Sequence, residues 1–204
     1  MVVLRTHTIP SVHGIGYIGQ GEYRCSINRE VTKEYLEWSS LLARGYSEKF
    51  KNYRPSYKDI YVNECWYNFQ NYCKWREDNY YEIEGETMCL DKDILVKGNK
   101  EYAPDKCIFV PERINILFIN RSNDRGGYPI GVTYDKRKNI YKARCSINEK
   151  HQKFLGCYNT PHEAFLAYKE IKEAYIKQVA DEYKGRIPDI LYEAMYAWEV
   201  EEDD

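Results

Sequence analysis

The sequence predicts an α+β fold, in which helices alternate with short strands that form small antiparallel sheets. Apolar and aromatic residues recur at helical spacing in several segments, and short apolar runs bounded by turn-forming residues separate them. The chain of 204 residues is long enough to bury one sizeable core or two small ones. Composition and pattern predict two domains, 1–120 and 121–204, joined by a polar, glycine-containing linker at 120–129.

The first domain is predicted to begin with a hairpin and two helices. The glycine-punctuated stretch at residues 14–28 has the composition of a hairpin. A helix is expected from about Thr32, and a second one over residues 63–79 with Asn63 as its N-cap. The apolar side chains that share a face in these helices, and should form the core, are Tyr35, Trp38, Leu41, Leu42, Trp66, Phe69, Tyr72 and Cys73.

The middle of the chain has the pattern of a strand, an open loop, a second strand and a helix. The strands are expected at 88–94 and 107–111, and the loop between them is rich in turn formers. Pro111 suits the first turn of a helix that continues through Ile114 and Leu117. This segment therefore predicts a compact ββα unit.

Three strands and two helices are expected in the second domain. The strands have apolar and β-branched residues between polar turns and are placed at 129–134, 139–147 and 153–158. A capping box of Thr160 and Glu163, with Pro161 in the first turn, predicts the start of the next helix. A last helix at about 187–198 should have Ile190 on its apolar face. The face of the middle strand that should pack on the first helix carries Tyr141, Ala143, Cys145 and Ile147.

Composition argues against several classes of protein. Charged residues make up 30% of the chain, and no apolar run approaches the roughly 18 residues of a membrane-spanning helix. The first residues lack the long apolar core and cleavage site of a signal peptide, so a cytoplasmic protein without a membrane partner is expected. Seven cysteines without a CxxC pair predict neither a zinc knuckle nor a disulfide framework, but reduced thiols packed in cores.

The charge is unevenly distributed along the chain. The net charge of −2 argues against nucleic-acid binding when it is taken over the whole protein. Residues 133–153 nevertheless hold seven basic and two acidic side chains, whereas residues 181–204 hold nine acidic and two basic ones. This separation indicates a basic segment suited to nucleic acid, followed by an acidic terminus.

The middle segment resembles the HNH, or ββα-metal, nucleases through Asp91-Lys92-Asp93, Asn99 and Asn115. The resemblance implies a divalent ion, Mg²⁺ or Mn²⁺, with Asp91 and Asn115 as its ligands. It also implies catalytic positions at Asn99, the loop asparagine that orients the base, and at Lys92, where the family has its histidine base. A lysine is cationic at neutral pH and a poor base, and Asp93 is expected on the opposite strand face.

Three interpretations of this degenerate motif are open. In the first, the metal is still bound, cleavage is weak or absent, and Lys92 contacts phosphate directly. In the second, another group or a water network serves as base, and the protein is an active metal-dependent endonuclease. In the third, the motif is purely structural. The sequence does not decide whether the protein is an enzyme.

The second domain closely resembles the apetala-type, or ethylene-response-factor, DNA-binding domain. The likeness is carried by Gly131-Val132, a basic turn, Leu155-Gly156 and a helix that contains Ala167-Tyr168. In that family the outer face of the sheet enters the major groove of double-stranded DNA. The resemblance implies DNA contacts by Thr133, Lys136, Arg137, Lys138, Lys142, Arg144 and Phe154. The alternative is that these bases form only a solvated sheet face.

Nearly the whole chain resembles bacteriophage homing endonucleases of the HNH type and their degenerate relatives, through segments such as EYLEWSSLLARGYSEKF, LDKDILVKGNKEY and RGGYPIGV. The primary hypothesis is therefore a DNA-binding phage protein of homing-endonuclease ancestry whose nuclease activity is impaired or lost. Its location would be the cytoplasm of a bacterial host. A second hypothesis is an interaction protein that inhibits a host factor through the acidic terminus, which could also be merely solvated.

Overall fold

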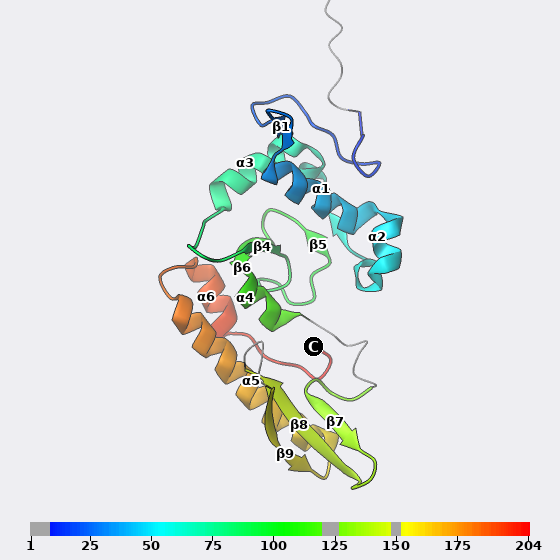
Figure 1. Ribbon diagram of the computed structural model, residues 1–204, viewed down its shortest axis with the longest axis vertical. Coiled ribbons are helices and arrows are strands. Elements are labelled where there is room, and N and C mark those ends of the chain that lie inside the picture. Colours follow the sequence, from blue (N-terminus) through cyan, green and yellow to red (C-terminus); the bar gives the residue numbers. More distant parts are fainter. Residues whose placement is uncertain (1–8, 120–126, 148–151) are drawn as a thin grey trace, which may run out of the picture. The chain divides into compact units, whose positions relative to one another are not determined.

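The computed structural model describes residues 9–119, 127–147 and 152–204 (Figure 1). The chain divides into two compact units, a first unit of Met1–Pro111 and a second unit of Glu112–Asp204. Helices and several small sheets occur along it, so the predicted α+β class is confirmed. No helix in the described ranges is both long and apolar enough to cross a membrane.

The first unit is built from short helices and paired strands. In chain order its described elements are β1 (Ser26–Ile27), β2 (Glu30–Val31), α1 (Lys33–Tyr46), α2 (Glu48–Tyr53), η1 (Pro55–Tyr57), β3 (Tyr61–Val62), η2 (Glu64–Tyr67), α3 (Phe69–Asn79), β4 (Met88–Asp91), β5 (Glu101–Tyr102) and β6 (Ile108–Pro111). Antiparallel pairs are formed by β1 with β2 and by β4 with β6, whereas β3 and β5 pair in parallel. The β5 strand lies inside the stretch predicted as an open loop, and its pairing with β3 joins that loop to the N-terminal part of the unit.

The core of the first unit contains the aromatic residues that were predicted from helical spacing. Trp38 of α1 and Phe69 and Tyr72 of α3 are fully buried, and the rings of Trp38 and Phe69 are 5.3 Å apart. The indole N–H of Trp38 donates to the carbonyl oxygen of Trp66 at 2.6 Å. Each such aromatic side chain contributes about 2 kcal/mol or more through burial. This cluster holds α1 and α3 together.

The helix predicted over residues 63–79 is divided in two. Asn63 caps the short turn η2, and Asn68 has an extended backbone and caps α3 by accepting the N–H of Gln70 at 3.0 Å. Asparagine competes with the helix by bonding to its own backbone, which explains the break at this residue. Helical spacing continues across the break, so the spacing alone did not reveal it.

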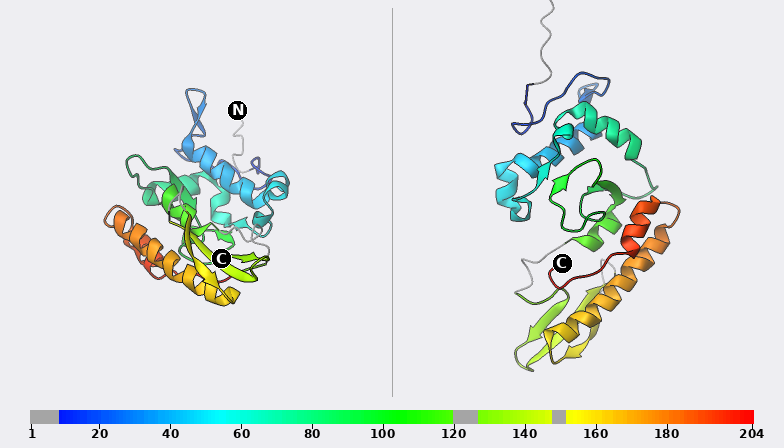
Figure 2. Two further views of the ribbon diagram at one scale, coloured as in Figure 1. Left: turned by 60° about the horizontal axis from the view of Figure 1, so that its bottom comes forward. Right: turned by 180° about the vertical axis from the view of Figure 1, so that it is seen from behind.

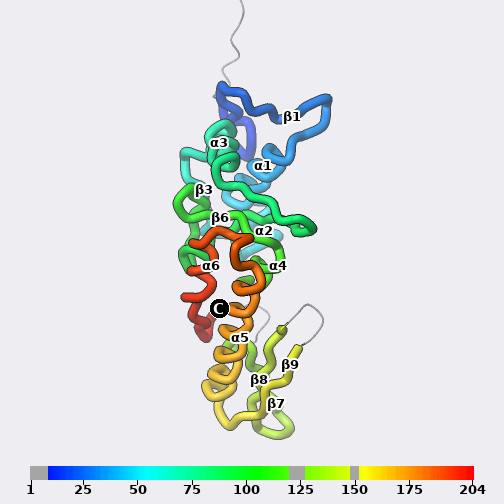
Figure 3. The backbone as a smooth tube through the Cα atoms, turned by 90° about the vertical axis from the view of Figure 1, so that its left-hand side faces the viewer, coloured from blue at the N-terminus to red at the C-terminus, as the bar shows by residue number. Residues whose placement is uncertain are grey.

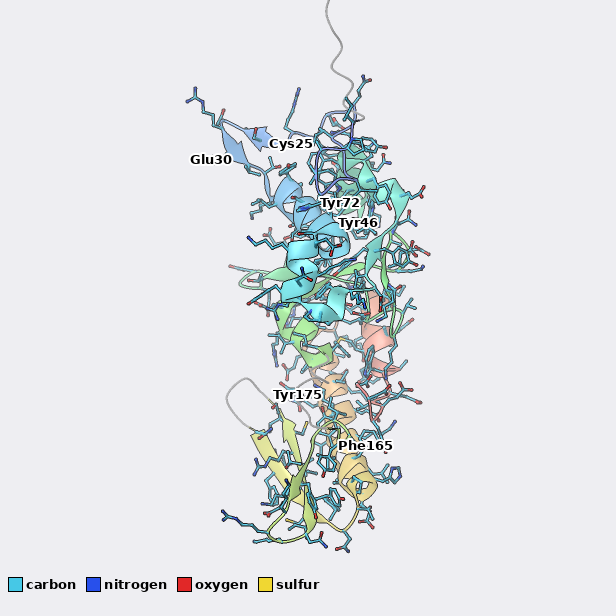
Figure 4. All side chains as sticks on the ribbon, turned by 90° about the vertical axis from the view of Figure 1, so that its right-hand side faces the viewer. Cys25, Glu30, Tyr46, Tyr72, Phe165 and Tyr175 are labelled. Carbon is cyan, nitrogen blue, oxygen red and sulfur yellow. The ribbon has the colours of Figure 1, made fainter. Side chains whose placement is uncertain are left out.

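The hairpin of the first unit lies at residues 26–31, after most of the glycine-rich stretch in which it was predicted. Its two-residue turn is made by Asn28 and Arg29, whose φ angles are 52° and 71°. The hairpin projects from the start of α1 (Figures 2 and 4). In the preceding stretch Gly16 serves packing instead, because a Cβ on it would lie 2.3 Å from Leu42 Cδ1.

The second unit combines a small sheet with two main helices. Its described elements are α4 (Glu112–Asn115), η3 (Ile116–Phe118), β7 (Val132–Asp135), β8 (Ile140–Ser146), β9 (Gln152–Tyr158), α5 (Pro161–Tyr183) and α6 (Asp189–Tyr196). The strands form an antiparallel sheet in the order β7-β8-β9, as predicted. The long helix α5 covers one face of this sheet, and α6 runs back along the C-terminal half of α5 (Figures 1 and 3).

The sheet packs on α5 through the face that the sequence predicted. Ala143 and Cys145 of β8 are 0% and 1% exposed, and Phe165 and Tyr168 are buried residues of α5 (Phe165 is labelled in Figure 4). A Cβ on Gly131, whose φ is +77°, would lie 2.1 Å from Tyr168 Cδ2. A glycine at the start of β7 therefore lets the tyrosine ring lie against the backbone.

The helices of this unit agree only in part with the prediction. The capping box of Thr160 and Glu163 starts α5 as predicted. On α6, Leu191 and Met195 are buried, but Ile190 is 58% exposed, so its predicted place on the apolar face was wrong. The helix begins at Asp189 and packs on α5 with a narrow face, which leaves Ile190 in solvent.

The boundary between the units lies at Pro111/Glu112, whereas composition and pattern predict it after residue 120. Side-chain contacts explain why α4 belongs to the second unit. The Arg113 guanidinium pairs with the Glu182 carboxylate and lies 5.6 Å from the ring centroid of Tyr183 on α5. Residues 120–126, which make up most of the predicted linker, lie outside the described residues.

The cysteines differ in their surroundings. Cys73, Cys107 and Cys145 are buried, as expected for thiols packed in cores, whereas Cys65 and Cys157 are exposed. Burial raises the pKa of the Cys73 and Cys107 thiols to about 12, which leaves them protonated and unreactive at neutral pH.

Candidate functional site

The strand pair of the nuclease-like motif is present, but its first strand is shorter than predicted. β4 ends at Asp91, which lies opposite Ile108 of β6, so Lys92 and Asp93 belong to the following loop. The helix that follows β6 is α4, a single turn in the second unit. Asp91 is therefore described within the first unit and Asn115, the last residue of α4, within the second.

The side chain of Asp91 holds the turn that follows its own strand. Its Oδ1 atom accepts the backbone N–H groups of Asp93 and Ile94, each at 2.7 Å. Burial raises the pKa of the Asp91 carboxyl above its usual value, and the nearby Asp93 charge acts in the same direction. The two backbone donors act against that shift by stabilising the carboxylate. One oxygen of the predicted metal ligand is thus used by the local backbone.

Lys92, at the predicted position of the base, is buried and paired. Its side chain is 9% exposed, and its Nζ atom lies 2.6 Å from each carboxylate oxygen of Asp93 and 2.7 Å from the carbonyl oxygen of Asn99. It also lies 5.9 Å from the ring centroid of Tyr102. An ammonium with these partners is not presented to a phosphate or to an attacking water. The expectation that Asp93 faces away from Lys92 was wrong, because strand alternation ends at Asp91.

Asn99 is brought together with Lys92, as expected for the loop asparagine. Its Nδ2 atom donates to the carbonyl oxygens of Lys92 and Glu101, at 2.9 and 2.7 Å. Its Oδ1 atom accepts the N–H of Glu101 at 3.0 Å. Asn99 therefore orients the backbone of Lys92, the residue that stands where the HNH nucleases resembled by this motif have their base.

The carboxylates of this motif do not fit a divalent-metal site within the first unit. Such an ion takes several hard oxygen ligands. Asp91 binds its own turn, and Asp93 neutralises Lys92. Within residues 9–119, 127–147 and 152–204, no group of three or more histidine, cysteine, aspartate and glutamate side chains is arranged to hold a metal. The geometry favours a structural role for these residues.

The residues predicted to contact DNA lie together on the second unit. Thr133 is opposite Lys142, and Arg144 is opposite Phe154, on the face of the sheet that points away from α5. The exposed side chains of this set are those of Thr133, Lys136, Arg137, Lys138, Arg144 and Phe154. Phe154 is 54% exposed although it is aromatic. We call the seven predicted residues the outer sheet face.

A shallow groove runs along the β7–β8 side of the outer sheet face. Its lining consists of Thr133, Tyr134, Asp135, Lys136, Arg137, Lys142 and Arg144. Tyr134 and Asp135 are not among the residues that the sequence resemblance implies. Asp135 Oδ1 accepts the N–H groups of Arg137 at 3.0 Å and Lys138 at 3.3 Å, which shapes the basic turn. An aspartate directly before a polar turn is a recognised sequence signal for this arrangement.

The two basic residues of β8 differ in their surroundings. The Lys142 ammonium lies 2.6 Å from Asp135 Oδ2, and this hydrogen bond holds the pKa of the Asp135 carboxyl below its usual value. The charge of Lys142 is therefore partly neutralised. Arg144 is exposed, and the register shifts between Ala143 and Arg144. Such a bulge re-aims the side chain that follows it.

The acidic C-terminal segment, residues 199–204, folds back on its own unit. Val200 is 3% exposed, its N–H donates to Glu173 Oε1 at 2.8 Å, and its carbonyl oxygen accepts from Lys169 Nζ at 2.9 Å. The carbonyl oxygen of Glu202 accepts the N–H of Ile130 at 3.0 Å. The segment is thus tied through Val200 to α5 and through Glu202 to Ile130, which precedes β7, while residues 201–203 are exposed.

Comparison with known proteins identifies no relative that decides between the interpretations. No protein-family model matches the chain, and neither a curated protein nor a solved structure matches it significantly. The likenesses to HNH nucleases and to apetala-type domains stay predictions from the sequence.

Proposed function

We propose that this protein binds double-stranded DNA through the outer sheet face and is of phage homing-endonuclease ancestry, with nuclease activity impaired or lost. The observation that carries the proposal is the convergence of exposed basic side chains and an exposed Phe154 on the side of the sheet opposite α5. In this proposal Arg144 reads a guanine edge, the lysines of the β7–β8 turn contact phosphates, and Phe154 contacts a thymine methyl.

The size of the sheet supports this docking. Neighbouring strands lie about 4.8 Å apart, so three strands span about 10 Å between the outer two axes. The major groove of B-form DNA is about 12 Å wide and admits a two-stranded β-ribbon, so two neighbouring strands of this sheet can enter it together. Because α5 covers the opposite face, the sheet can present its polar face without losing the packing that stabilises it.

The surroundings of Lys92 support the second part of the proposal. A base must reach the attacking water, whereas the Lys92 ammonium is held by Asp93 and by the Asn99 carbonyl oxygen. In this proposal the β4–β6 pair is retained as a scaffold. The alternative, an active metal-dependent endonuclease that uses another base, would need a catalytic group outside the set predicted from the motif.

DNA binding is tested by selecting duplexes from a randomised pool and measuring their affinity by fluorescence anisotropy. Replacing Arg144 by alanine should weaken binding of the selected duplex by about 1–3 kcal/mol, or about 5- to 150-fold, if it reads a base. Lys177→Ala, at an exposed residue of α5, is the matched control and should change affinity little. Equal affinity and equal sequence preference of Arg144→Ala and wild type would contradict the proposal.

Nuclease activity is tested by incubating supercoiled plasmid with the protein and Mg²⁺ or Mn²⁺. We expect no cleavage by the wild type above that of Asp91→Ala. Robust cleavage that the Asp91 substitution abolishes would overturn the impaired-nuclease part and favour the active-enzyme alternative. The DNA-binding part of the proposal is tested separately by Arg144→Ala.

A further inference from the structure

The segment of residues 48–58 in the first unit is basic and aromatic, and of its three aromatic rings Tyr57 packs against the core. It comprises α2, η1 and the residues around them, and it follows α1 in Figure 1. Neither α2 nor η1 contains a buried residue. Its one acidic residue is Glu48, against four bases and three aromatics, namely Lys49, Lys51, Arg54, Lys58, Phe50, Tyr53 and Tyr57.

Tyr53 is the feature of this segment that folding does not explain. The residue is 76% exposed, although it carries a large aromatic ring. The Arg54 guanidinium carbon lies 5.1 Å from the Tyr53 ring centroid, so a cation and a ring are presented together. An exposed ring contributes little to the core, so the stability of the unit gives no reason for an aromatic residue here.

A second arginine–tyrosine pair in the same unit shows the contrast. The Arg76 guanidinium lies 4.1 Å from the Tyr80 ring centroid, but Arg76 also bonds Glu37 at 2.6 Å. The Tyr80 ring packs against Phe109 with centroids 5.0 Å apart. The Arg76–Tyr80 pair is thus half-buried and held by these contacts, whereas Tyr53 and Arg54 are both exposed to solvent.

The surrounding contacts hold the 48–58 segment in one conformation. Ser47 caps α2 by accepting the N–H of Phe50. The rings of Phe50 and Tyr57 meet edge-on with centroids 5.3 Å apart. Lys51 Nζ donates to the carbonyl oxygen of Lys58 at 3.0 Å, which ties the two ends together. The Tyr53–Arg54 pair is therefore presented on an ordered support.

We propose that the 48–58 segment binds an unpaired strand of nucleic acid, with a base stacked on Tyr53 and phosphates held by Arg54 and its neighbouring lysines. An exposed ring flanked by cations is the arrangement that single-strand-binding surfaces use. Bases inside a duplex are already stacked on both faces and offer only their edges. The six residues of α2 rise only about 9 Å, too short for a helix that reads several base pairs in the major groove.

The proposal is tested with the full-length protein and a labelled oligothymidylate of about 16 nucleotides, long enough for one site of this kind. Replacing Tyr53 by alanine should weaken binding at least about fivefold, the lower end for loss of one stacked base. Tyr53→Phe keeps the ring and should bind like wild type. Tyr61→Ala, at an exposed tyrosine outside the segment, is the matched control. The same measurement with an oligouridylate shows whether the bound single strand is DNA or RNA.

Charge variants provide a second measurement that does not depend on Tyr53. Lys49→Gln and Lys58→Gln alter exposed side chains, so the fold should tolerate them. Each should reduce the slope of log affinity against log salt by about 0.7 if its lysine contacts a phosphate. Absence of oligonucleotide binding, or binding unchanged by both Tyr53→Ala and the lysine variants, would overturn the proposal.

This inference is independent of the duplex-binding proposal. Arg144→Ala should leave oligothymidylate affinity unchanged, and Tyr53→Ala should leave duplex affinity unchanged. Loss of both activities in either variant would contradict the assignment of separate surfaces to the two units.

Discussion

The β4–β6 motif of the first unit and the outer sheet face of the second both carry polar side chains in patterns typical of nucleic-acid proteins, yet they use them differently. In the motif, Asp91, Lys92 and Asn99 bind the loop that contains them. On the outer sheet face, Arg144 and the basic turn are exposed to solvent. Polar and charged side chains therefore stabilise the fold in one region and are exposed to solvent in the other.

The difference follows from the way each region is stabilised. Between Ile94 and Tyr102 the loop that joins β4 to β6 has no buried apolar side chain, so polar side chains satisfy its backbone groups there, and the buried Lys92 requires a counter-charge. The β7–β8–β9 sheet is held by its packing on α5 through residues such as Ala143 and Cys145. Its opposite face is not needed for stability. A polar residue is thus a stronger candidate for recognition where apolar packing already holds the backbone.

The largest expected effect is on Asn99. Replacing it by alanine removes three hydrogen bonds and leaves partly buried backbone groups of Lys92 and Glu101 without this partner. We expect the free energy of unfolding of the first unit to fall by about 3 kcal/mol. Urea denaturation followed by tryptophan fluorescence measures it. A change below about 0.5 kcal/mol, the typical size for a surface site, would remove the contrast between the two regions.

A smaller loss is expected from breaking the pair of Lys92 with Asp93. Lys92→Met should lower the free energy of unfolding by about 2 kcal/mol, less than the roughly 3–5 kcal/mol of a fully buried pair. The carboxylate partner is 41% exposed and remains partly hydrated, which limits the cost. A double-mutant cycle with Asp93→Asn isolates the interaction. Additive effects of the two substitutions would show that the pair contributes no coupling.

Substitutions of Asp91 test whether its carboxylate stabilises the turn or binds a metal. Asp91→Ala leaves the N–H groups of Asp93 and Ile94 without an acceptor and should cost about 1–2 kcal/mol. Asp91→Asn keeps an acceptor oxygen and should be close to wild type in stability at neutral pH. Mg²⁺ or Mn²⁺ should not stabilise the wild type over Asp91→Asn. A metal-dependent rise in melting temperature that only the wild type shows would favour the metal-bound interpretation.

The pH dependence of the same pair of proteins follows from the raised pKa of Asp91. Because the folded state holds this proton more tightly than the unfolded state, the stability of the wild type relative to Asp91→Asn should fall as pH rises from the reference value of 3.8 through the folded pKa. Below pH 3.8 the carboxyl is protonated in both states, so the stability of the wild type relative to Asp91→Asn should be at its highest there. Chemical denaturation at several pH values measures it. The opposite slope would mean that the hydrogen bonds outweigh burial.

The smallest effect on stability is expected at Arg144. Arg144→Ala removes an exposed side chain and should change the free energy of unfolding by less than about 0.5 kcal/mol while it weakens duplex binding. Denaturation of the purified variant measures the stability. A loss as large as that of Asn99→Ala would show that the outer sheet face also serves the fold.

Local chemistry predicted much of this protein correctly. The core aromatics of α1 and α3, the capping box of Thr160 and Glu163, and the buried face of β8 follow from side-chain periodicity and from caps that involve residues near in sequence. The clustering of the outer sheet face follows from strand alternation on a paired sheet. All of these depend on spacings that the sequence itself contains.

Only the tertiary structure decided which polar side chains are presented to solvent. Strand alternation placed Asp93 away from Lys92, but β4 ends at Asp91, and its end is set by pairing with β6. The pairing of β3 with β5, the assignment of α4 to the second unit and the docking of Val200 all join residues distant in sequence. Local spacing in the sequence indicated most of the helices and the buried face of β8, because these depend on residues that are near in sequence. Which residues contact one another was decided by the fold, because burial and hydrogen bonding depend on what packing brings together.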